Sequence, residues 1–206
     1  MRVYVLLDRS GSMSPRWHEA MAAINGYVGS LARARSTRGA RVTVALFDAV
    51  PDYRGEPEER LCFQVVREGH RAAAWVPLDP EEAWPRGITP LYDAVARLVE
   101  LAEANGRTRR SLVVIMTDGL ENASREHTRT TARARLDRCR ERGWQVVFLG
   151  ADFDATTQSA DLGGTASQTI NAVSGSFASA YADLAGATVS YAVSGASLAF
   201  AEEGRA

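Results

Sequence analysis

Short apolar runs that end in polar residues recur along the chain and predict its strands. Uninterrupted runs of this length are typical of strands that are buried on both faces, as in a parallel sheet. We therefore expect strands over residues 3–7, 42–47, 112–116 and 144–149, of which the first three run directly into Asp8, Asp48 and Thr117-Asp118.

Apolar residues at helical spacing occupy the segments between these strands. Met21, Ile24, Val28 and Leu31 lie on one face of a helix that we place at residues 15–35. A second helix is expected to begin with Thr89 as its N-cap and Pro90 at its first position, and Asn105-Gly106 should end it. Further helices are predicted at residues 127–142, 154–162 and 176–184.

The order of these elements predicts a doubly wound, Rossmann-like α/β fold with a mostly parallel sheet and helices on both faces. Residues 61–66 follow residues 42–47 closely enough to pair with them as one antiparallel edge strand, across a Pro/Gly/Glu-rich segment at 51–59. Residues 70–86 contain three prolines and are expected to be irregular apart from a short turn at 80–83. A short strand is predicted at 166–170. We expect one domain over residues 1–186 and an Ala/Ser/Gly-rich tail over 187–206, with residues 189–193 as a candidate added strand.

Composition and charge exclude several classes of protein. With 206 residues, 46% hydrophobic and 24% charged, the chain matches a single globular domain. Its net charge of −1 provides no field for nucleic acid or an anionic membrane. The arginines of the helix at 127–142 alternate with acidic residues, which is typical of a solvated face. No segment reaches membrane-spanning length and the first apolar run is too short for a signal peptide, so we expect a cytoplasmic protein without membrane or nucleic-acid partners. Cys62 and Cys139 lack metal-ligand spacing and are expected to be free thiols.

Oxygen-bearing side chains follow the predicted strands at the edge where ligands of doubly wound folds bind. Asp8-x-Ser10-x-Ser12 follows the first strand, and Gly11 gives this loop the freedom to curl. Thr89 precedes a helix, and Asp118 follows the strand at 112–116. Carboxylates and hydroxyls without His or Cys suit a small hard cation, so we predict Mg²⁺ or Mn²⁺ rather than zinc. A site with only two carboxylates should leave an open coordination position.

Three segments together resemble the metal-ion-dependent adhesion site of von Willebrand factor A domains. They are Asp8-Arg9-Ser10-Gly11-Ser12, Gly87-Ile88-Thr89-Pro90-Leu91 and Met116-Thr117-Asp118-Gly119, and the resemblance covers roughly residues 2–149. It implies that Ser10 and Ser12 bind the metal directly, that Asp8 and Asp118 act directly or through water, and that Thr89 enters or leaves the shell with conformation. It further implies a non-enzymatic module whose open position accepts a Glu or Asp of a protein partner. The chain also resembles short intracellular bacterial members of the family, some of them associated with tellurium resistance or with AAA-type ATPases.

Other interpretations of the same residues remain open. A Mg²⁺-dependent phosphohydrolase would also use an aspartate after the first strand, but its general acid two residues later is replaced here by Ser10, and the chain has no lysine. No glycine-rich phosphate loop supports a nucleotide-binding domain. A structural domain that binds no metal is a third alternative. Capping alone would explain Thr89, and surface aspartates would explain Asp48 and Asp152.

Overall fold

The computed structural model describes residues 1–52, 56–106, 108, 110–151, 159–172 and 177–200. In this part of the chain a six-stranded sheet has the order β3-β2-β1-β4-β5-β6. All neighbouring strands are parallel except β2 and β3, which confirms the predicted doubly wound sheet with one antiparallel edge strand. The strands are β1 (Arg2–Asp8), β2 (Arg41–Asp52), β3 (Glu56–Arg71), β4 (Ser111–Thr117), β5 (Gln145–Ala151) and β6 (Thr169–Ala172).

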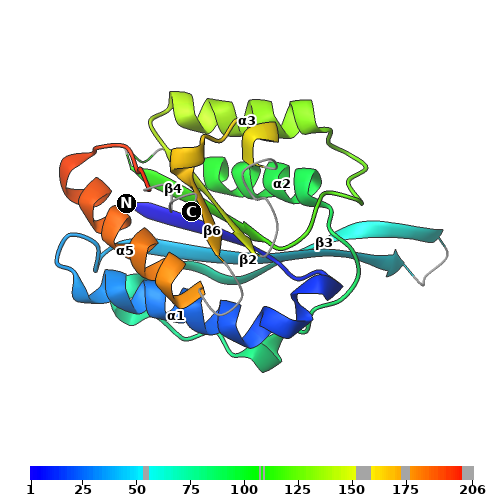
Figure 1. Cartoon of the computed structure of the whole chain (residues 1–206), viewed down its shortest axis with the longest axis horizontal. Coiled ribbons are helices and arrows are strands. Elements are labelled where there is room, and N and C mark those ends of the chain that lie inside the picture. Colours follow the sequence, from blue (N-terminus) through cyan, green and yellow to red (C-terminus); the bar gives the residue numbers. More distant parts are fainter. Residues whose placement is uncertain (53–55, 107, 109, 152–158, 173–176, 201–206) are drawn as a thin grey trace, which may run out of the picture.

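Helices cover both faces of this sheet (Figure 1). One face packs against α1 (Trp17–Arg33) and α5 (Phe177–Ser194), and the other against α2 (Leu91–Ala104) and α3 (Arg129–Glu141). Alternate residues of β1 supply the two cores: Val3, Val5 and Leu7 face α1, while Tyr4 and Leu6 face α2. This double burial explains why the interiors of β1 (Val3 to Leu7) and β4 (Leu112 to Met116) are uninterrupted apolar runs.

The central strand β1 lies at the topological switch point of the sheet. The chain leaves β1 toward β2 on one side and returns to β4 on the other. Crevices outside the carboxyl ends of such strands are the usual ligand sites of doubly wound folds. The 3-10 turn Gly11–Arg16 follows β1 at this edge, and the loop that follows β4 lies at the same edge.

The β2–β3 hairpin is longer than the sequence pattern predicts. Asp8, the last residue of β1, is level with Phe47, whereas β2 continues to Asp52. At about 3.4 Å per residue, the hairpin extends about 17 Å beyond the end of β1. In Figure 1 it projects past the other strands. Strand β3 ends at Arg71, inside the stretch at residues 70–86 predicted to be irregular. The rest of that stretch contains short turns at Ala72–Ala74 and Pro80–Glu82.

The expected strand at residues 189–193 is wrong, because these residues form the last turns of α5. The helix, expected to end at Leu184, continues to Ser194, so the domain boundary predicted after residue 186 falls inside it. Thr188 and Tyr191 are buried, and Thr188 shares a 3.1 Å hydrogen bond with the Tyr27 hydroxyl of α1. Small residues allow α5 to lie close to α1, and this packing outweighs the strand preference of its valines.

Two other predictions are met only in part. The strand expected at residues 166–170 is a 3-10 turn at Ala166–Gln168 followed by β6. The helix expected at 154–162 falls largely on residues outside the described ranges, although residues 159–161 are helical. Among the helices that the structure describes, none combines the length and apolar character needed to cross a bilayer.

Candidate metal centre

Asp8 occupies the centre of the polar cluster at the end of β1. Its side chain is fully buried, and its carboxylate accepts hydrogen bonds from the Ser10 amide at 2.7 Å and from the Thr117 hydroxyl at 2.6 Å. Burial raises the pKa of Asp8 to about 6, and repulsion from Asp118 adds to this shift, while the hydrogen bonds from Thr117 and Ser10 oppose it. A nearby cation would relieve the cost of holding this charge inside the protein.

Ser10, Ser12 and Asp118 form a chain of oxygen contacts beside Asp8. The hydroxyl oxygens of Ser10 and Ser12 lie 3.0 Å apart, and Ser12 donates to the Asp118 carboxylate at 2.6 Å. The second oxygen of Asp118 accepts from Nη1 of Arg16 at 3.2 Å. Side chains separated by 106 residues in sequence thus meet directly, because the loops after β1 and β4 curl over the same edge.

Gly119 shows how closely the oxygens converge. A Cβ placed on this glycine would lie 3.1 Å from Oγ1 of Thr89, 3.7 Å from Oγ of Ser12 and 4.0 Å from Oδ2 of Asp8. Oxygen atoms from the loop after β1 and from the loop at Thr89 therefore converge beside Gly119, and Asp118 on the loop after β4 joins them through its contact with Ser12. The structure brings together all five residues singled out from the sequence: Asp8, Ser10, Ser12, Thr89 and Asp118.

The expected capping role of Thr89 is wrong. Helix α2 begins at Leu91 with Pro90 at the N-cap position and no side-chain cap from this residue. The Tyr92 amide instead donates to Glu121 at 2.9 Å and to the Ser124 hydroxyl at 3.0 Å. The Thr89 side chain is buried, and its hydroxyl makes no hydrogen bond to another described residue. A hydroxyl released from capping is available as a ligand.

Backbone contacts fix the loop that carries Thr89. Ile88 pairs with Ala49 of β2 through two backbone hydrogen bonds of 2.9 and 3.0 Å, and the Gly11 amide donates to the Gly87 carbonyl at 3.1 Å. Gly87 has φ = +66°, and a Cβ there would overlap the Ala49 carbonyl. Only glycine fits this close approach. The two loops of the cluster are therefore held in register by main-chain contacts.

Asp48 forms a second buried cluster one strand away. Arg9 donates to both of its carboxylate oxygens at 3.1 Å, and Nε of Arg86 donates to Oδ2 at 2.8 Å. Both guanidinium groups also donate to the Cys62 sulfur, at 3.3 and 3.4 Å. Sequence reasoning treated Asp48 as a surface residue and missed these arginines. The available signal was Arg9 inside an otherwise small and polar loop.

The donor set fits a divalent cation of the predicted type. Among the described residues, no group of three or more His, Cys, Asp and Glu side chains is placed to hold a metal. The cluster at β1 has two carboxylates and three hydroxyls, which is a hard all-oxygen set with a low ligand charge. Such a set matches Mg²⁺ or Mn²⁺, and Cys62 and Cys139 are free thiols.

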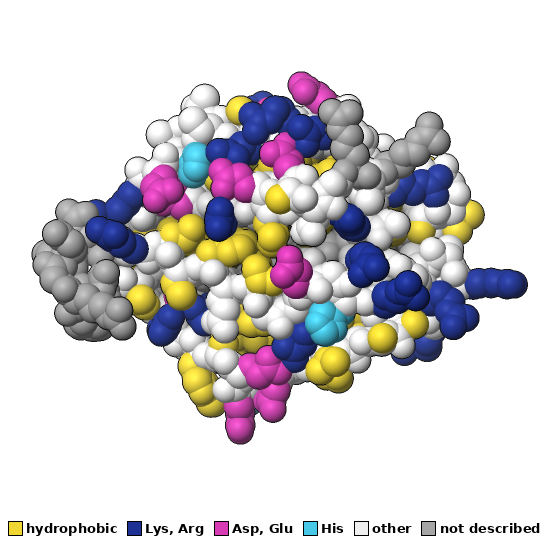
Figure 2. Space-filling model, turned by 180° about the vertical axis from the view of Figure 1, so that it is seen from behind, with side chains coloured by type: hydrophobic (Ala, Val, Ile, Leu, Met, Phe, Trp, Pro, Cys, Tyr) yellow, Lys and Arg dark blue, Asp and Glu magenta, His cyan; other side chains and the backbone are white. Residues whose placement is uncertain are grey.

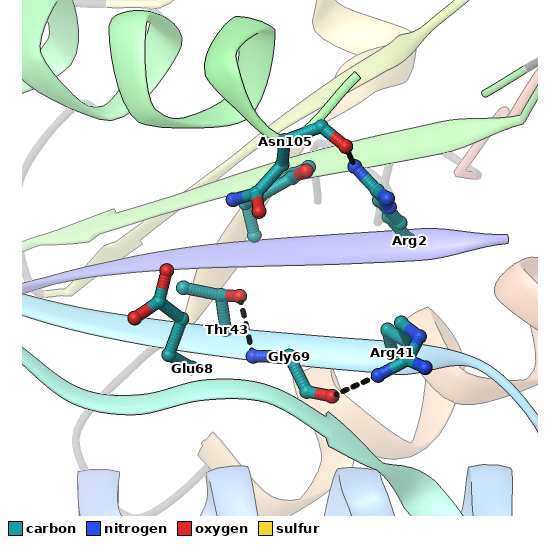
Figure 3. A pocket seen from close by; sticks show the side chains of 7 residues that line it. Arg2, Arg41, Thr43, Glu68, Gly69 and Asn105 are labelled. Carbon is teal, nitrogen blue, oxygen red and sulfur yellow. Dashed lines mark hydrogen bonds between the residues drawn. The ribbon is translucent and has the colours of Figure 1, made fainter. Parts of the chain in front are cut away.

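A pocket at the opposite edge of the sheet does not compete with this cluster. It has a volume of about 300 Å³, and its polar lining includes Arg2, Arg41, Thr43, Glu68 and Asn105 (Figure 3). Arg2 donates to the Asn105 carbonyl and Arg41 donates to the Gly69 carbonyl. Both arginines therefore provide hydrogen-bond donors to backbone carbonyl groups. On the molecular face in Figure 2, acidic side chains lie in the left and central parts of the view, and among charged side chains the right part carries basic ones only.

Comparisons with known proteins rest on structure, because no family model and no curated protein matches the chain. The pilus adhesin SpaC from Lactobacillus rhamnosus GG matches with 13% identity and a TM-score of 0.69, over 92% of this chain and 30% of the adhesin. Manganese-loaded TRAP protein from Plasmodium vivax matches with 18% identity and a TM-score of 0.59, over 88% and 70%. The VWA domain of SpRpn10 matches with 11% identity and a TM-score of 0.59, over 89% and 94%.

The fold is thus a doubly wound α/β domain with a polar cluster at its switch point. More narrowly, it is the von Willebrand factor A fold, since the matches cover about nine tenths of the chain. The chain spans less than a third of the length of SpaC but nearly all of the SpRpn10 domain. At these identities the comparisons establish the fold alone.

Proposed function

We propose that this protein is a divalent-cation-dependent protein-binding module. Asp8, Ser10, Ser12, Thr89 and Asp118 would hold Mg²⁺ or Mn²⁺, and a Glu or Asp of a partner protein would complete the coordination shell. The observation that carries this proposal is the convergence of oxygens from three loops beside Gly119. The manganese-loaded state of the Plasmodium vivax protein with the same fold supports a divalent cation.

The position of the Thr89 hydroxyl supports the proposal. It does not cap α2, and its Oγ1 lies 3.1 Å from the position of a Cβ on Gly119, beside Oγ of Ser12 and Oδ2 of Asp8. A cation at the cluster would satisfy it together with the oxygens of Ser12 and Asp8. Of the two carboxylates, Asp118 is also paired with Arg16, so a divalent cation would be only partly compensated, which favours an anionic ligand from outside.

The same geometry supports binding rather than hydrolysis. A phosphohydrolase of the type considered from the sequence requires a carboxylic acid two residues after the first aspartate. That position is Ser10, whose hydroxyl contacts Ser12 at 3.0 Å. Arg16, which lies beside the cluster, is paired with Asp118. We therefore assign no chemical step to the site.

Isothermal titration with Mg²⁺ and Mn²⁺ tests the proposal. Wild-type protein should bind one ion per chain, and Ser12→Ala should lose at least about tenfold in affinity, or about 1.4 kcal/mol. Ser14→Ala is the matched control, because Ser14 lies two residues away in the same turn and donates only to the Gly11 carbonyl. Equal affinities of the Ser12 and Ser14 variants would contradict the ligand assignment, and absence of binding to wild type would contradict the function.

A further inference from the structure

A fixed and half-exposed cation lies beside the candidate metal centre. The Arg86 side chain is 51% exposed, while Nε donates at 2.8 Å to Asp48, which is fully buried. Nη2 contacts only the Cys62 sulfur, a weak acceptor, and Nη1 donates to no other described residue. The buried carboxylate thus orients the guanidinium in advance and leaves donors facing solvent. Little side-chain entropy would be lost when an anion binds there.

Six charged side chains at and beside the candidate metal centre have no net charge before a cation is added. Three carboxylates face three guanidinium groups, and their contacts are Asp118 with Arg16 and Asp48 with Arg9 and Arg86, while Asp8 accepts only neutral donors. A divalent ion would give this group of six side chains a net charge of +2, apart from other charges at the edge such as that of Glu121. One carboxylate from a partner neutralises one of these two positive charges, so a second negative charge on the partner is favoured.

The position of Arg86 sets the distance between its guanidinium group and the metal centre. Its amide donates to the Arg9 carbonyl at 2.8 Å, directly between Asp8 and Ser10. Its guanidinium reaches Asp48, one strand over from β1. One strand spacing is about 4.8 Å and the contact of Nε with Asp48 adds 2.8 Å, so the guanidinium lies on the order of 7–10 Å from the metal centre. An extended peptide covers this distance in two to three residues.

The β2–β3 hairpin borders the candidate metal centre on the side of Arg86. It projects beyond the end of β1 (Figure 1), and Asp48, which binds Arg86, lies on β2 of this hairpin. A segment bound across the metal centre and Arg86 would run toward the base of this hairpin. Contact with the hairpin limits the direction that the segment can take.

We propose that the partner presents a doubly acidic segment, in which one carboxylate binds the metal and a second, two or three residues away, binds Arg86. The inference rests on the proposed function and adds the chemistry of the partner to it. The second contact is a charge-assisted, potentially bidentate hydrogen bond to a guanidinium held by a buried carboxylate. Lysine would keep the charge at this position but not the planar geometry.

Synthetic peptides provide the probe. Acetylated Gly/Ser peptides with one Glu, with two Glu three residues apart, or with two Glu nine residues apart are titrated by NMR into protein saturated with Mg²⁺. The closely spaced pair should bind about threefold to fivefold tighter than the single Glu, which is the upper part of the range for exposed ion pairs. The widely spaced pair should bind like the single Glu. Chelator should abolish binding of all three.

Variants then locate the second contact. Arg86→Gln should remove the advantage of the closely spaced pair, and Arg86→Lys should reduce it, with folding checked by thermal denaturation. Arg97→Gln is the control, because Arg97 is a 62% exposed arginine on α2, and this variant should keep the full advantage. An advantage that survives Arg86→Gln would overturn the inference, as would equal binding of all three peptides to wild type.

The two levels of the proposal fail in different ways. If the single-Glu peptide binds in a Mg²⁺-dependent manner but the closely spaced pair binds no tighter, the doubly acidic partner is wrong and the proposed function stands. If the protein binds metal but no peptide binds in a Mg²⁺-dependent manner, the proposed recognition of a partner carboxylate fails as well and only the metal site stands. If titration detects no metal, the proposed function fails and the inference fails with it.

Discussion

Gly119→Ala should weaken metal binding without unfolding the protein. The added methyl would lie 3.1 Å from the Thr89 hydroxyl, so that oxygen would have to move by a few tenths of an ångström. Mg²⁺ tolerates little deviation from its ligand distances of about 2.1 Å. Partial loss of one ligand should lower the affinity about tenfold or more, which corresponds to about 1.4 kcal/mol.

The backbone at Gly119 does not require glycine, because its φ lies outside the left-handed region. The free energy of unfolding in chelator should therefore change by less than about 1 kcal/mol. Gly26→Ala is the matched control: a Cβ there meets no atom within 4 Å, and alanine should stabilise the interior of α1 by about 0.5–1 kcal/mol. Isothermal titration and chemical denaturation supply both readouts. Wild-type affinity in a folded Gly119→Ala protein would refute the assigned position of the ligands.

Three further predictions concern stability and reactivity. In chelator, Asp8→Asn should stabilise the protein at pH 8 but not at pH 4: the pKa of Asp8 is raised from 3.8 to about 6, so ionisation of the folded protein costs up to about 3 kcal/mol as the pH rises through this range. Denaturation curves showing greater stabilisation at pH 4 would contradict the burial argument. Gly87→Ala should lower the free energy of unfolding by more than about 2 kcal/mol, because its Cβ would overlap the backbone of β2. Gly106→Ala, which is also at positive φ but in open space, should lower it by about 1 kcal/mol. Equal losses in the two variants would contradict the close approach of Gly87 to β2. A thiol reagent should label Cys62 alone in the folded protein, because Cys139 is buried and its pKa is raised to about 11, and rapid labelling of both thiols before unfolding would be incompatible with this packing.

The sheet and four of the five candidate ligands follow from local sequence. Apolar runs such as that of β1 are long enough to identify doubly buried strands, and their polar ends mark the carboxyl edge. Asp8, Ser10 and Ser12 are placed by a single loop, and Asp118 follows directly from β4. These positions depend on short-range chain geometry, which a sequence pattern records.

Contacts between distant segments could not be predicted in this way. Thr89 looks like a helix cap until the structure shows that Glu121, 29 residues away from Tyr92, caps α2 instead. Arg86 reaches Asp48 across 38 residues, and nothing in the local sequence pairs them. The last turns of α5 form because they pack on α1, against the local preference of a valine-containing tail. In each case tertiary packing decides between two locally acceptable arrangements.

The central claim is that five oxygen-bearing side chains bind one divalent cation. Electron paramagnetic resonance of Mn²⁺ titrated into wild-type protein and into Asp118→Ala tests it most directly, because free and bound ions give distinct signals. We expect one bound Mn²⁺ per wild-type chain, displaced by Mg²⁺, and little bound ion in the variant. A wild-type protein that leaves all Mn²⁺ free, or a variant that binds it equally well, would contradict the claim.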